Sequence, residues 1–294
     1  MGIAMPVGER RTSVAVLGAG LIGIDLADKV QGSKSLELRL VAGRSRQSLG
    51  LARAAAMGCP TACGGIDALL ESGPFDVVFD ASNADVHAGH WAALREIGTT
   101  LIDLTPTQLG TVIVPTVNGD QAAAHRHINL VSCGGQAAIP VLNAVAQHCT
   151  PAYIEVVSTG ASASAGRATR LNLDQYIATT QAAIRSFTHA PDAKVMVNLS
   201  PARPAPPFRV AMTVLAPDLN PGPLRAAITA AAEEVQAFAP GFTVNSVELE
   251  DDRISVVVEV TATGGRIPSY AGNLDIINGA ALLLAEQYAA APSR

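Results

Sequence analysis

The most constraining feature of this chain is a glycine spacing, G-x-G-x-x-G, directly after a short β-prone run at residues 13–17 and before a helical pattern. A strand that turns through such glycines into a helix forms the phosphate-binding unit of a dinucleotide fold, because the glycines permit a tight turn, close backbone approach to the pyrophosphate and close helix packing. The helix N-terminus adds N–H donors and the positive end of the helix dipole. The motif therefore predicts a dinucleotide-binding turn made of Gly18, Gly20, Leu21, Ile22 and Gly23.

The order of β-prone and helical segments predicts two different sheets. Up to about residue 131, β-prone runs alternate with helical segments, which is typical of a doubly wound parallel sheet. These runs lie at residues 13–17, 36–41, 76–80, 99–104 and 128–131. From about residue 151 the runs lengthen and lie nearer one another, which predicts a second, α+β domain. Its strands are expected at residues 153–158, 194–199, 208–215, 242–248 and 253–261, with helices at 173–187, 223–238 and, closing the chain, 273–288.

The composition excludes several classes of protein. Hydrophobic residues make up 49% of the 294 and charged residues 15%, with a net charge of −5 and no basic run, so neither disorder nor a nucleic-acid partner is expected. No run of about 18 apolar residues is present, so no membrane span is expected either. The N-terminus lacks a secretory-signal pattern, and the expected location is cytoplasmic. The four cysteines lack zinc-site spacing, and no metal is predicted.

The end of the second predicted strand indicates which dinucleotide is bound. An NAD site usually has a carboxylate there for the ribose 2′-hydroxyl, whereas an NADP site has arginine for the 2′-phosphate. This chain has Arg44, Ser45 and Arg46 and no carboxylate. Two guanidinium groups and a hydroxyl suit a phosphate dianion. The prediction is NADP, with NAD as the other cofactor to consider; the alternative is that both arginines are merely solvated.

Cys133 differs from the other cysteines because it follows the β-prone run 128–131 and precedes Gly134, Gly135 and a helical pattern. A thiol at a helix N-terminus is expected to have a lowered pKa, and the N–H groups there can cradle a developing oxyanion. The alternative is a buried structural cysteine. Beside a dinucleotide domain, a thiol suggests that an aldehyde is oxidised to an enzyme thioester. The acyl group then passes to water, to phosphate or to a thiol such as CoA, and the spacing does not choose among these.

Blocks along nearly the whole chain resemble the CoA-acylating acetaldehyde dehydrogenases that partner 4-hydroxy-2-oxovalerate aldolases. The Cys-Gly-Gly-Gln and Tyr-Ala-Gly-Asn-Leu-Asp blocks are specific to this family. The matching blocks are residues 17–23 with 25–26, 79–81 with His87, 102–106, 114–118, 133–137, 164–172 and 270–276.

The resemblance implies a fold, partners and residue roles. It implies a Rossmann domain at residues 1–132, completed by a returning C-terminal helix in 272–294, and an α+β catalytic and dimerisation domain at 133–271. It implies that Cys133 is the acyl-thioester nucleophile, that CoA is a co-substrate, and that the protein forms a homodimer with an aldolase partner. Beyond the glycine turn, the implied cofactor contacts are Ser164, Ala165, Gly166, Arg170, Asn172 and Asn273.

The chain departs from the family pattern at two functional positions. The family typically reads Met-Arg-Asp-Thr where this chain has Phe-Arg-Val-Ala at residues 208–211, so the Asp thought to orient or activate the cysteine is replaced by Val210. The acidic residue after the second strand is replaced by Ser45, between two arginines. Together these changes predict a specialised relative that uses NADPH to reduce an acyl thioester to a short aldehyde.

Two other functions stay open at this point. One is an acyl-phosphate reductase of the semialdehyde dehydrogenase type, and the other is a cofactor-binding scaffold for an aldolase that lacks catalysis. His87 and His90 are candidate proton carriers, although a structural role is the alternative for both. The phosphate of an acyl phosphate would need arginines, of which the chain offers Arg167, Arg170, Arg203 and Arg209.

Overall fold

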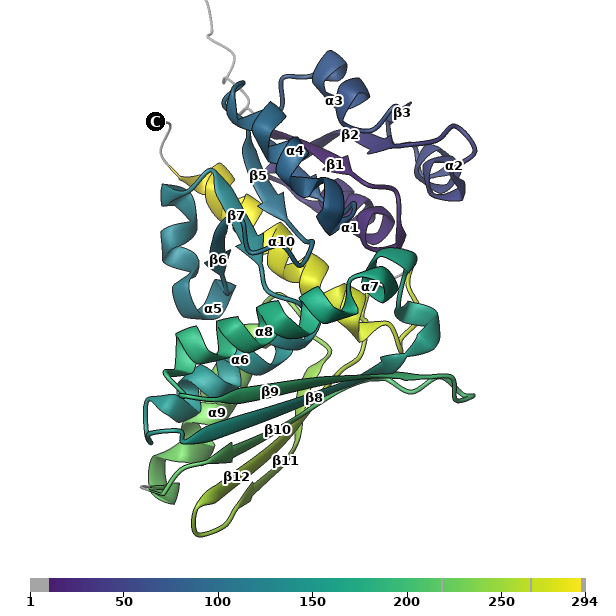
Figure 1. Cartoon of the computed structure of the whole chain (residues 1–294). Helices are drawn as coiled ribbons and strands as arrows, with labels where there is room; N and C mark the ends of the chain where they lie inside the picture. The colour runs from purple at the N-terminus through teal and green to yellow at the C-terminus, as the bar shows by residue number, and fades with distance from the viewer. Residues whose placement is uncertain (1–10, 218, 265, 292–294) are drawn as a thin grey trace, which may run out of the picture.

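The chain folds as two β-sheets with helices packed on them, in a computed structural model that describes residues 11–217, 219–264 and 266–291 (Figure 1). Within these residues the first sheet has seven strands in the order β3-β2-β1-β4-β5-β7-β6, and every adjacent pair is parallel. Its strands are β1 (Thr12–Leu17), β2 (Leu36–Gly43), β3 (Thr61–Cys63), β4 (Val77–Asp80), β5 (Thr100–Asp103), β6 (Thr111–Ile113) and β7 (His127–Leu130). The order reverses between β1 and β4, as in a Rossmann fold, so the predicted doubly wound sheet is confirmed.

Helices cover both faces of this sheet because its central strands are apolar on both sides. In β1, Val14 and Val16 belong to a core shared with three helices, α1 (Leu21–Gly32), α2 (Leu49–Ala56) and the C-terminal α10 (Gly272–Ala290). Ala15 and Leu17 instead face α3 (Ile66–Ser72) and α4 (Ala84–Arg95). The short helices α5 (Pro115–Asn118) and η1 (Gly119–Ala124) connect β6 to β7.

The second sheet is mixed and has one face covered by helices. Its order is β11-β12-β10-β8-β9, with β8 and β9 parallel and the other pairs antiparallel. Its strands are β8 (Tyr153–Ala161), β9 (Ala193–Ser200), β10 (Phe208–Leu215), β11 (Phe242–Leu249) and β12 (Arg253–Val260). Alternate residues of β10, such as Val210 and Met212, are buried under the helices, which gives the half-buried pattern of an antiparallel sheet. The predicted α+β part is confirmed.

Three helices form that cover: α6 (Cys133–Ala146), α8 (Leu173–Thr188) and α9 (Pro221–Gln236). No described helix lies on the opposite face of this sheet (Figure 1). Two short segments, η2 (Ser162–Ser164) and α7 (Arg167–Leu171), lie between β8 and α8.

Helix α6 and helix α10 join the two parts. Helix α10 follows β12 along the chain and returns to pack against α1, as predicted, while also contacting α6. Cys133 packs against the cores of both sheets, so it lies at their junction. The predicted division at 132/133 and 271/272 stays a prediction. Among the described helices, none combines the length and the apolar character that a membrane span requires.

Candidate active site

The turn between β1 and α1 has the geometry that its glycines predict. Gly18 has a φ of +112°, which favours glycine, and a Cβ at Gly23 would lie 1.9 Å from the carbonyl oxygen of Gly18. Gly20 caps the N-terminus of α1, and apart from its chain neighbours no described atom lies within 4 Å of where its Cβ would be. Gly18 and Gly23 therefore serve the turn itself, whereas Gly20 leaves open space where a phosphate would lie.

Alanine substitutions at two of these glycines should separate folding from dinucleotide binding. Gly23→Ala is expected to lower the free energy of unfolding by about 2–3 kcal/mol, because the added methyl group overlaps a backbone carbonyl. Gly20→Ala is expected to leave stability nearly unchanged and to weaken dinucleotide binding by roughly tenfold or more, about 1.4 kcal/mol. Thermal unfolding and cofactor titration measure the two effects. Equal losses of stability in both variants would contradict this assignment.

A groove extends from this turn along the carboxyl ends of β1, β2 and β4, where the strand order reverses. Four chain segments, residues 17–22, 42–45, 81–83 and 166–169, form most of its walls. Among the described residues that line it, two are arginines and none is Asp or Glu. The groove is thus suited to an anionic ligand.

Of the three residues predicted to bind the 2′-phosphate of NADP, two line this groove and one does not. Arg44 and Ser45 line it, as does Arg167. Arg46 does not, and its Nε donates a hydrogen bond to Cys63 Sγ at 3.4 Å. Of Arg44 and Arg46, only Arg44 therefore lines the groove.

Cys133 is the first residue of α6, as predicted, and a tyrosine lies against its thiol. The hydroxyl oxygen of Tyr176 is 3.3 Å from Cys133 Sγ and accepts a hydrogen bond from the Gly134 N–H at 2.8 Å. Ser132 caps the helix, because its Oγ accepts from the Gly135 N–H at 3.0 Å. Two N–H groups of the first turn thus already have acceptors, so they do not form the free oxyanion cradle that the sequence predicts.

The acidity of the Cys133 thiol also differs from the prediction. Burial raises the pKa of Cys133, and the contacts with Tyr176 and the Gly134 N–H counteract only part of that rise. Burial penalises the charged thiolate, and here this penalty outweighs the hydrogen bonds at the helix N-terminus. The expectation of a lowered pKa is therefore wrong in direction.

A smaller cavity at Cys133 adjoins the groove and shares seven lining residues with it. Its other walls include residues 104–106, Asn172, Tyr176 and Asn273. None of the described residues that line it is Asp, Glu, His, Lys or Arg. The residues that line both the cavity and the groove are Ile22, Ala81, Ser82, Asn83, Ala168, Thr169 and Leu274.

The residues of the predicted cofactor loop after β8 differ in whether they line the groove, the cavity or neither. Gly166 lines the groove, and Asn172 lines the cavity, where its Nδ2 donates to Asn83 Oδ1 at 2.6 Å. Arg170 lines neither, because its guanidinium group donates to the carbonyl oxygens of Ala165 and Ser162 and so holds the loop.

Asn273 joins this loop to α10 and faces the cavity at Cys133. Its Nδ2 donates to the carbonyl oxygen of Ser164 at 3.2 Å. Its Oδ1 is buried and has no hydrogen-bond partner among the described residues. A buried acceptor without a partner is costly, so this oxygen is suited to receive an N–H from a bound ligand.

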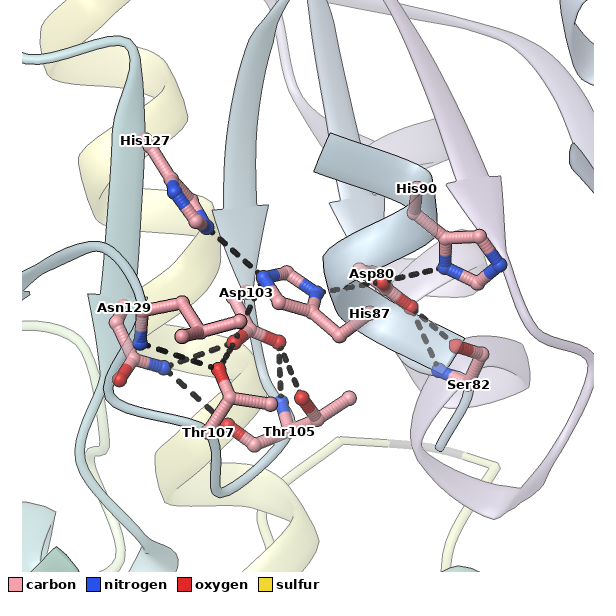
Figure 2. A network of polar contacts seen from close by, with 10 residues as sticks. Asp80, Ser82, His87, His90, Asp103, Thr105, Thr107, His127 and Asn129 are labelled. Carbon is pink, nitrogen blue, oxygen red and sulfur yellow. Dashed lines mark hydrogen bonds and ion pairs between the residues drawn. The ribbon is translucent and has the colours of Figure 1, made fainter. Parts of the chain in front are cut away.

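Two buried aspartates at the ends of β4 and β5 hold the loops that line the cavity (Figure 2). Asp80 Oδ1 accepts from the backbone N–H of Ser82 at 3.0 Å and from its hydroxyl at 2.5 Å. Asp103 Oδ1 accepts from the N–H and the hydroxyl of Thr105, both at 2.7 Å. Ser82 and Thr105 line the cavity, so the two carboxylates position its walls from behind.

His87 bridges these carboxylates. Its Nδ1 lies 2.8 Å from Asp80 Oδ2, and its Nε2 lies 3.2 Å from Asp103 Oδ2 and 2.8 Å from His127 Nε2 (Figure 2). His90 Nδ1 also lies 2.8 Å from Asp80 Oδ2. His87, Asp103 and His127 each bring one ligand-type atom to the same place. The 2.8 Å between the two Nε2 atoms and the 3.2 Å from His87 Nε2 to Asp103 Oδ2 are hydrogen-bond separations, so the three residues form a hydrogen-bonded cluster.

The pKa values of the residues in this cluster are shifted in different directions. Although burial opposes it, the pKa of His87 is raised by the hydrogen bond to Asp80 and the charge of Asp103. Burial likewise opposes the shift at Asp80, where the hydrogen bonds from His87 and His90 hold the pKa well below its usual range. Burial raises the pKa of Asp103 to about 6 and lowers that of His127 to about 4. His87 therefore lies at the centre of the cluster, and its contacts with the two carboxylates favour its protonated form.

The two histidines named as proton carriers lie away from the thiol. Neither His87 nor His90 lines the cavity at Cys133; His90 lines the outer groove, and His87 is fully buried. Their contacts support the structural alternative over proton delivery to Cys133.

Val210, at the position of the missing family Asp, lies in β10 next to a residue of β8 that reaches the first turn of α6. It is buried and pairs in register with Ser158. Ser158 Oγ has no hydrogen-bond partner among the described residues and lies 2.3 Å from where a Cβ on Gly134 would be. Neither Val210 nor Ser158 lines the cavity.

Sequence reasoning missed Tyr176, Asn83 and Thr105 as site residues. Tyr176 lies in a correctly predicted helix, 43 residues after Cys133. Nothing in the local pattern indicates that the two side chains meet, because their contact depends on how α8 packs against α6. The residues after β4 and β5 could have been found from the rule that ligands bind at the carboxyl ends of parallel strands.

Known proteins resemble this chain over nearly its whole length. Residues 133–268 match the family model described as prokaryotic acetaldehyde dehydrogenase, dimerisation. The acetaldehyde dehydrogenase of Streptomyces griseus is 49% identical over 99% of this chain and 94% of that protein, and that of Pectobacterium atrosepticum is 40% identical over 95% and 96%. The solved structure of aspartate semialdehyde dehydrogenase II from Vibrio cholerae shares the fold, with a TM-score of 0.66 at 12% identity over 94% of this chain and 98% of that one.

The fold and the full-length similarity agree. A doubly wound sheet with a glycine turn is followed by a second part that matches the dimerisation model from its first residue, Cys133. Identity of 40–49% over at least 95% of the chain is ample to place it in a family. The chain is a member of the acetaldehyde dehydrogenase family, and so an oxidoreductase that acts on aldehydes.

Proposed function

We propose that the protein is a CoA-acylating aldehyde dehydrogenase that interconverts a short aldehyde and its acyl thioester through Cys133. The observation that carries this proposal is that the groove adjoins the cavity at Cys133 and shares seven lining residues with it, while the thiol lies in that cavity at the start of a helix. The family resemblance supports the aldehyde as substrate and CoA as acyl acceptor.

Cys133 performs the covalent step. Its thiolate adds to the carbonyl carbon of the aldehyde, and loss of hydride from that carbon leaves an acyl thioester on Sγ. The groove would hold a nicotinamide dinucleotide, whose chemistry would be to take up this hydride, or to supply it in the reverse direction. CoA, after its thiol has lost its proton to water, attacks the thioester carbonyl as a thiolate; the new C–S bond forms, the bond to Cys133 Sγ breaks, and Cys133 leaves as a thiolate. Residues 81–83 and 104–106 form walls of the cavity in which this thioester would form.

The chain's own residues fit a dinucleotide. Gly20 leaves space for the pyrophosphate at the N-terminus of α1, and the groove has no carboxylate among its described lining residues. The unpartnered Oδ1 of Asn273 would accept from the nicotinamide carboxamide. Arg44 at the end of β2 favours NADP over NAD, because a guanidinium group binds a 2′-phosphate well and a neutral ribose poorly.

The two neighbouring arginines offer a matched test of the cofactor proposal. Arg44→Ala is expected to raise the KM for NADPH by roughly tenfold or more and to change that for NADH little, since it removes one charge-assisted phosphate contact of about 1.5–3 kcal/mol. Arg46→Ala is the control, because Arg46 lies outside the groove lining. A wild-type kcat/KM that clearly favours NADH would refute the NADP proposal.

The direction and acyl donor are tested together. Wild-type protein with a short acyl-CoA and NADPH is expected to release aldehyde as NADPH is consumed. Turnover of acyl phosphates but not of acyl-CoA would instead support a semialdehyde dehydrogenase-type reductase. Cofactor binding with no turnover of either substrate would support the scaffold alternative.

The same proposal includes a homodimer and an aldolase partner. The description of the matching family model supports dimerisation, and the helix-free face of the second sheet is where a second copy would pack. The aldolase follows from the family resemblance, and co-purification with the expressed aldolase tests it.

A further inference from the structure

The cavity at Cys133 has very few groups that could deprotonate the thiol or stabilise the thiolate. Among its described lining residues, the titratable side chains are Cys133 itself and Tyr176. The valine at position 210 places no carboxylate nearby, and His87 and His90 lie elsewhere. Whatever stabilises a thiolate here must therefore be a neutral donor.

The hydrogen bonds of Tyr176 can be assigned by counting protons. The Gly134 N–H can only donate, so the tyrosine oxygen accepts at 2.8 Å. The phenol carries one proton of its own, and Cys133 Sγ lies 3.3 Å away, within the range of an O–H···S hydrogen bond. Because a thiolate has no proton to donate, the phenol is the donor in this contact whenever Cys133 is ionised. Burial raises the pKa of Tyr176 well above its usual range, so the phenol keeps this proton.

The position of the phenol is set by its surroundings. The carbonyl oxygen of Tyr176 accepts from Thr180 Oγ1 at 2.6 Å, and the same Thr180 hydroxyl lies 2.6 Å from Ser132 Oγ, which caps α6. A Cβ at residue 134 would lie 2.6 Å from the tyrosine oxygen. Glycine at 134 is thus what allows the hydroxyl to reach the start of α6.

We propose that Tyr176 is a catalytic residue, whose O–H donates a hydrogen bond to Cys133 Sγ and stabilises the thiolate in place of a basic or acidic side chain. This role rests on the proposed function of Cys133 as nucleophile. The thiol proton leaves to water before substrate binds, and Tyr176 keeps its own proton throughout. When Sγ becomes part of a thioester it loses its negative charge, and the hydrogen bond weakens. The contact therefore favours the free thiolate as the leaving group when the acyl chain departs.

The experiment measures the alkylation rate of Cys133 by iodoacetamide against pH, followed by mass spectrometry of the peptide that contains it. Tyr176→Phe is expected to raise the apparent pKa of alkylation by about 1–2 units, the equivalent of one charge-assisted hydrogen bond. At pH 7 the rate should fall about tenfold or more. Tyr288→Phe on α10 is the matched control and should leave the profile unchanged, because Tyr288 does not line the cavity.

A second variant keeps the proposal testable if Tyr176→Phe folds poorly. Site-specific 3-fluorotyrosine at position 176 keeps the side chain and makes the phenol a stronger donor, so the apparent pKa of alkylation should fall. Profiles that coincide with wild type in either folded variant would overturn the proposal. Alkylation needs no substrate, so a shift in these profiles together with no acyl adduct on the wild-type protein would support the contact while rejecting the proposed function.

Discussion

Cys133→Ala is expected to abolish acyl-adduct formation and to reduce aldehyde turnover by about 10⁴-fold or more, because no other described side chain lining the cavity is a comparable nucleophile. Intact-mass analysis after incubation with a short acyl-CoA should show one acyl group on the wild-type protein and none on the variant. NADPH added to the acylated wild-type protein should remove the adduct as aldehyde appears.

Cys149→Ala is the matched control for this result. Cys149 follows α6, at the opposite end from Cys133, and lines neither the groove nor the cavity. The Cys149→Ala variant should therefore still form the acyl adduct and turn over aldehyde. Full activity in Cys133→Ala would rule out the thioester mechanism, whereas cofactor binding should survive in this variant because Cys133 lies outside the groove lining.

His87→Gln is expected to destabilise the fold by about 3–5 kcal/mol, since it removes the imidazole whose two ring nitrogens face two buried carboxylates. The charges of Asp80 and Asp103 would then lose their shared partner, and with it the anchoring of the two loops that line the cavity. Chemical denaturation measures the loss. His148→Gln, at an exposed position, is the control and should change stability by no more than about 0.5 kcal/mol.

The pH dependence of this variant gives a second signature. The pKa of His87 is raised in the folded chain, so its stabilisation is complete below the unfolded value of about 6.5 and is lost as pH rises through the folded pKa. Asp80, with its lowered pKa, contributes above about 3.9 and loses that contribution as the pH falls below it. Wild-type stability should therefore fall on the alkaline side of about 6.5, and His87→Gln should lack that fall. An unchanged alkaline slope in the variant would show that His87 is not the group responsible.

Much of the fold could be predicted from the sequence because it depends on local spacing. The glycine turn, the apolar runs of β1, β4 and β5, and the change to longer strands after residue 151 each follow from backbone conformation or from periodicity. Short elements such as β3 and β6 were missed, because three residues carry too little pattern to distinguish a strand from a loop.

In the candidate site too, features that depend on local sequence could be predicted, and features that depend on tertiary packing could not. The placement of Cys133 at a helix N-terminus could be predicted, since a β-prone run followed by glycines and a helical pattern is local information. The direction of its pKa shift could not, because desolvation depends on how α6 is buried between the two cores. The sequence likewise does not distinguish Arg44 from Arg46. The course of the chain after β2 decides that Arg44 lines the groove and that Arg46 bonds to Cys63 instead.

By itself, the sequence determined the class of fold, the dinucleotide turn and the cysteine at the start of α6, because each is set by residues within a few positions of one another. Only the tertiary structure decided which groups surround the thiol. Tyr176 reaches Cys133, and His87 joins Asp80 to Asp103, through contacts between elements far apart along the chain. Hydrogen bonds and burial act over a few ångströms in space, whatever the separation in sequence, and so the chemistry of the site belongs to the folded chain.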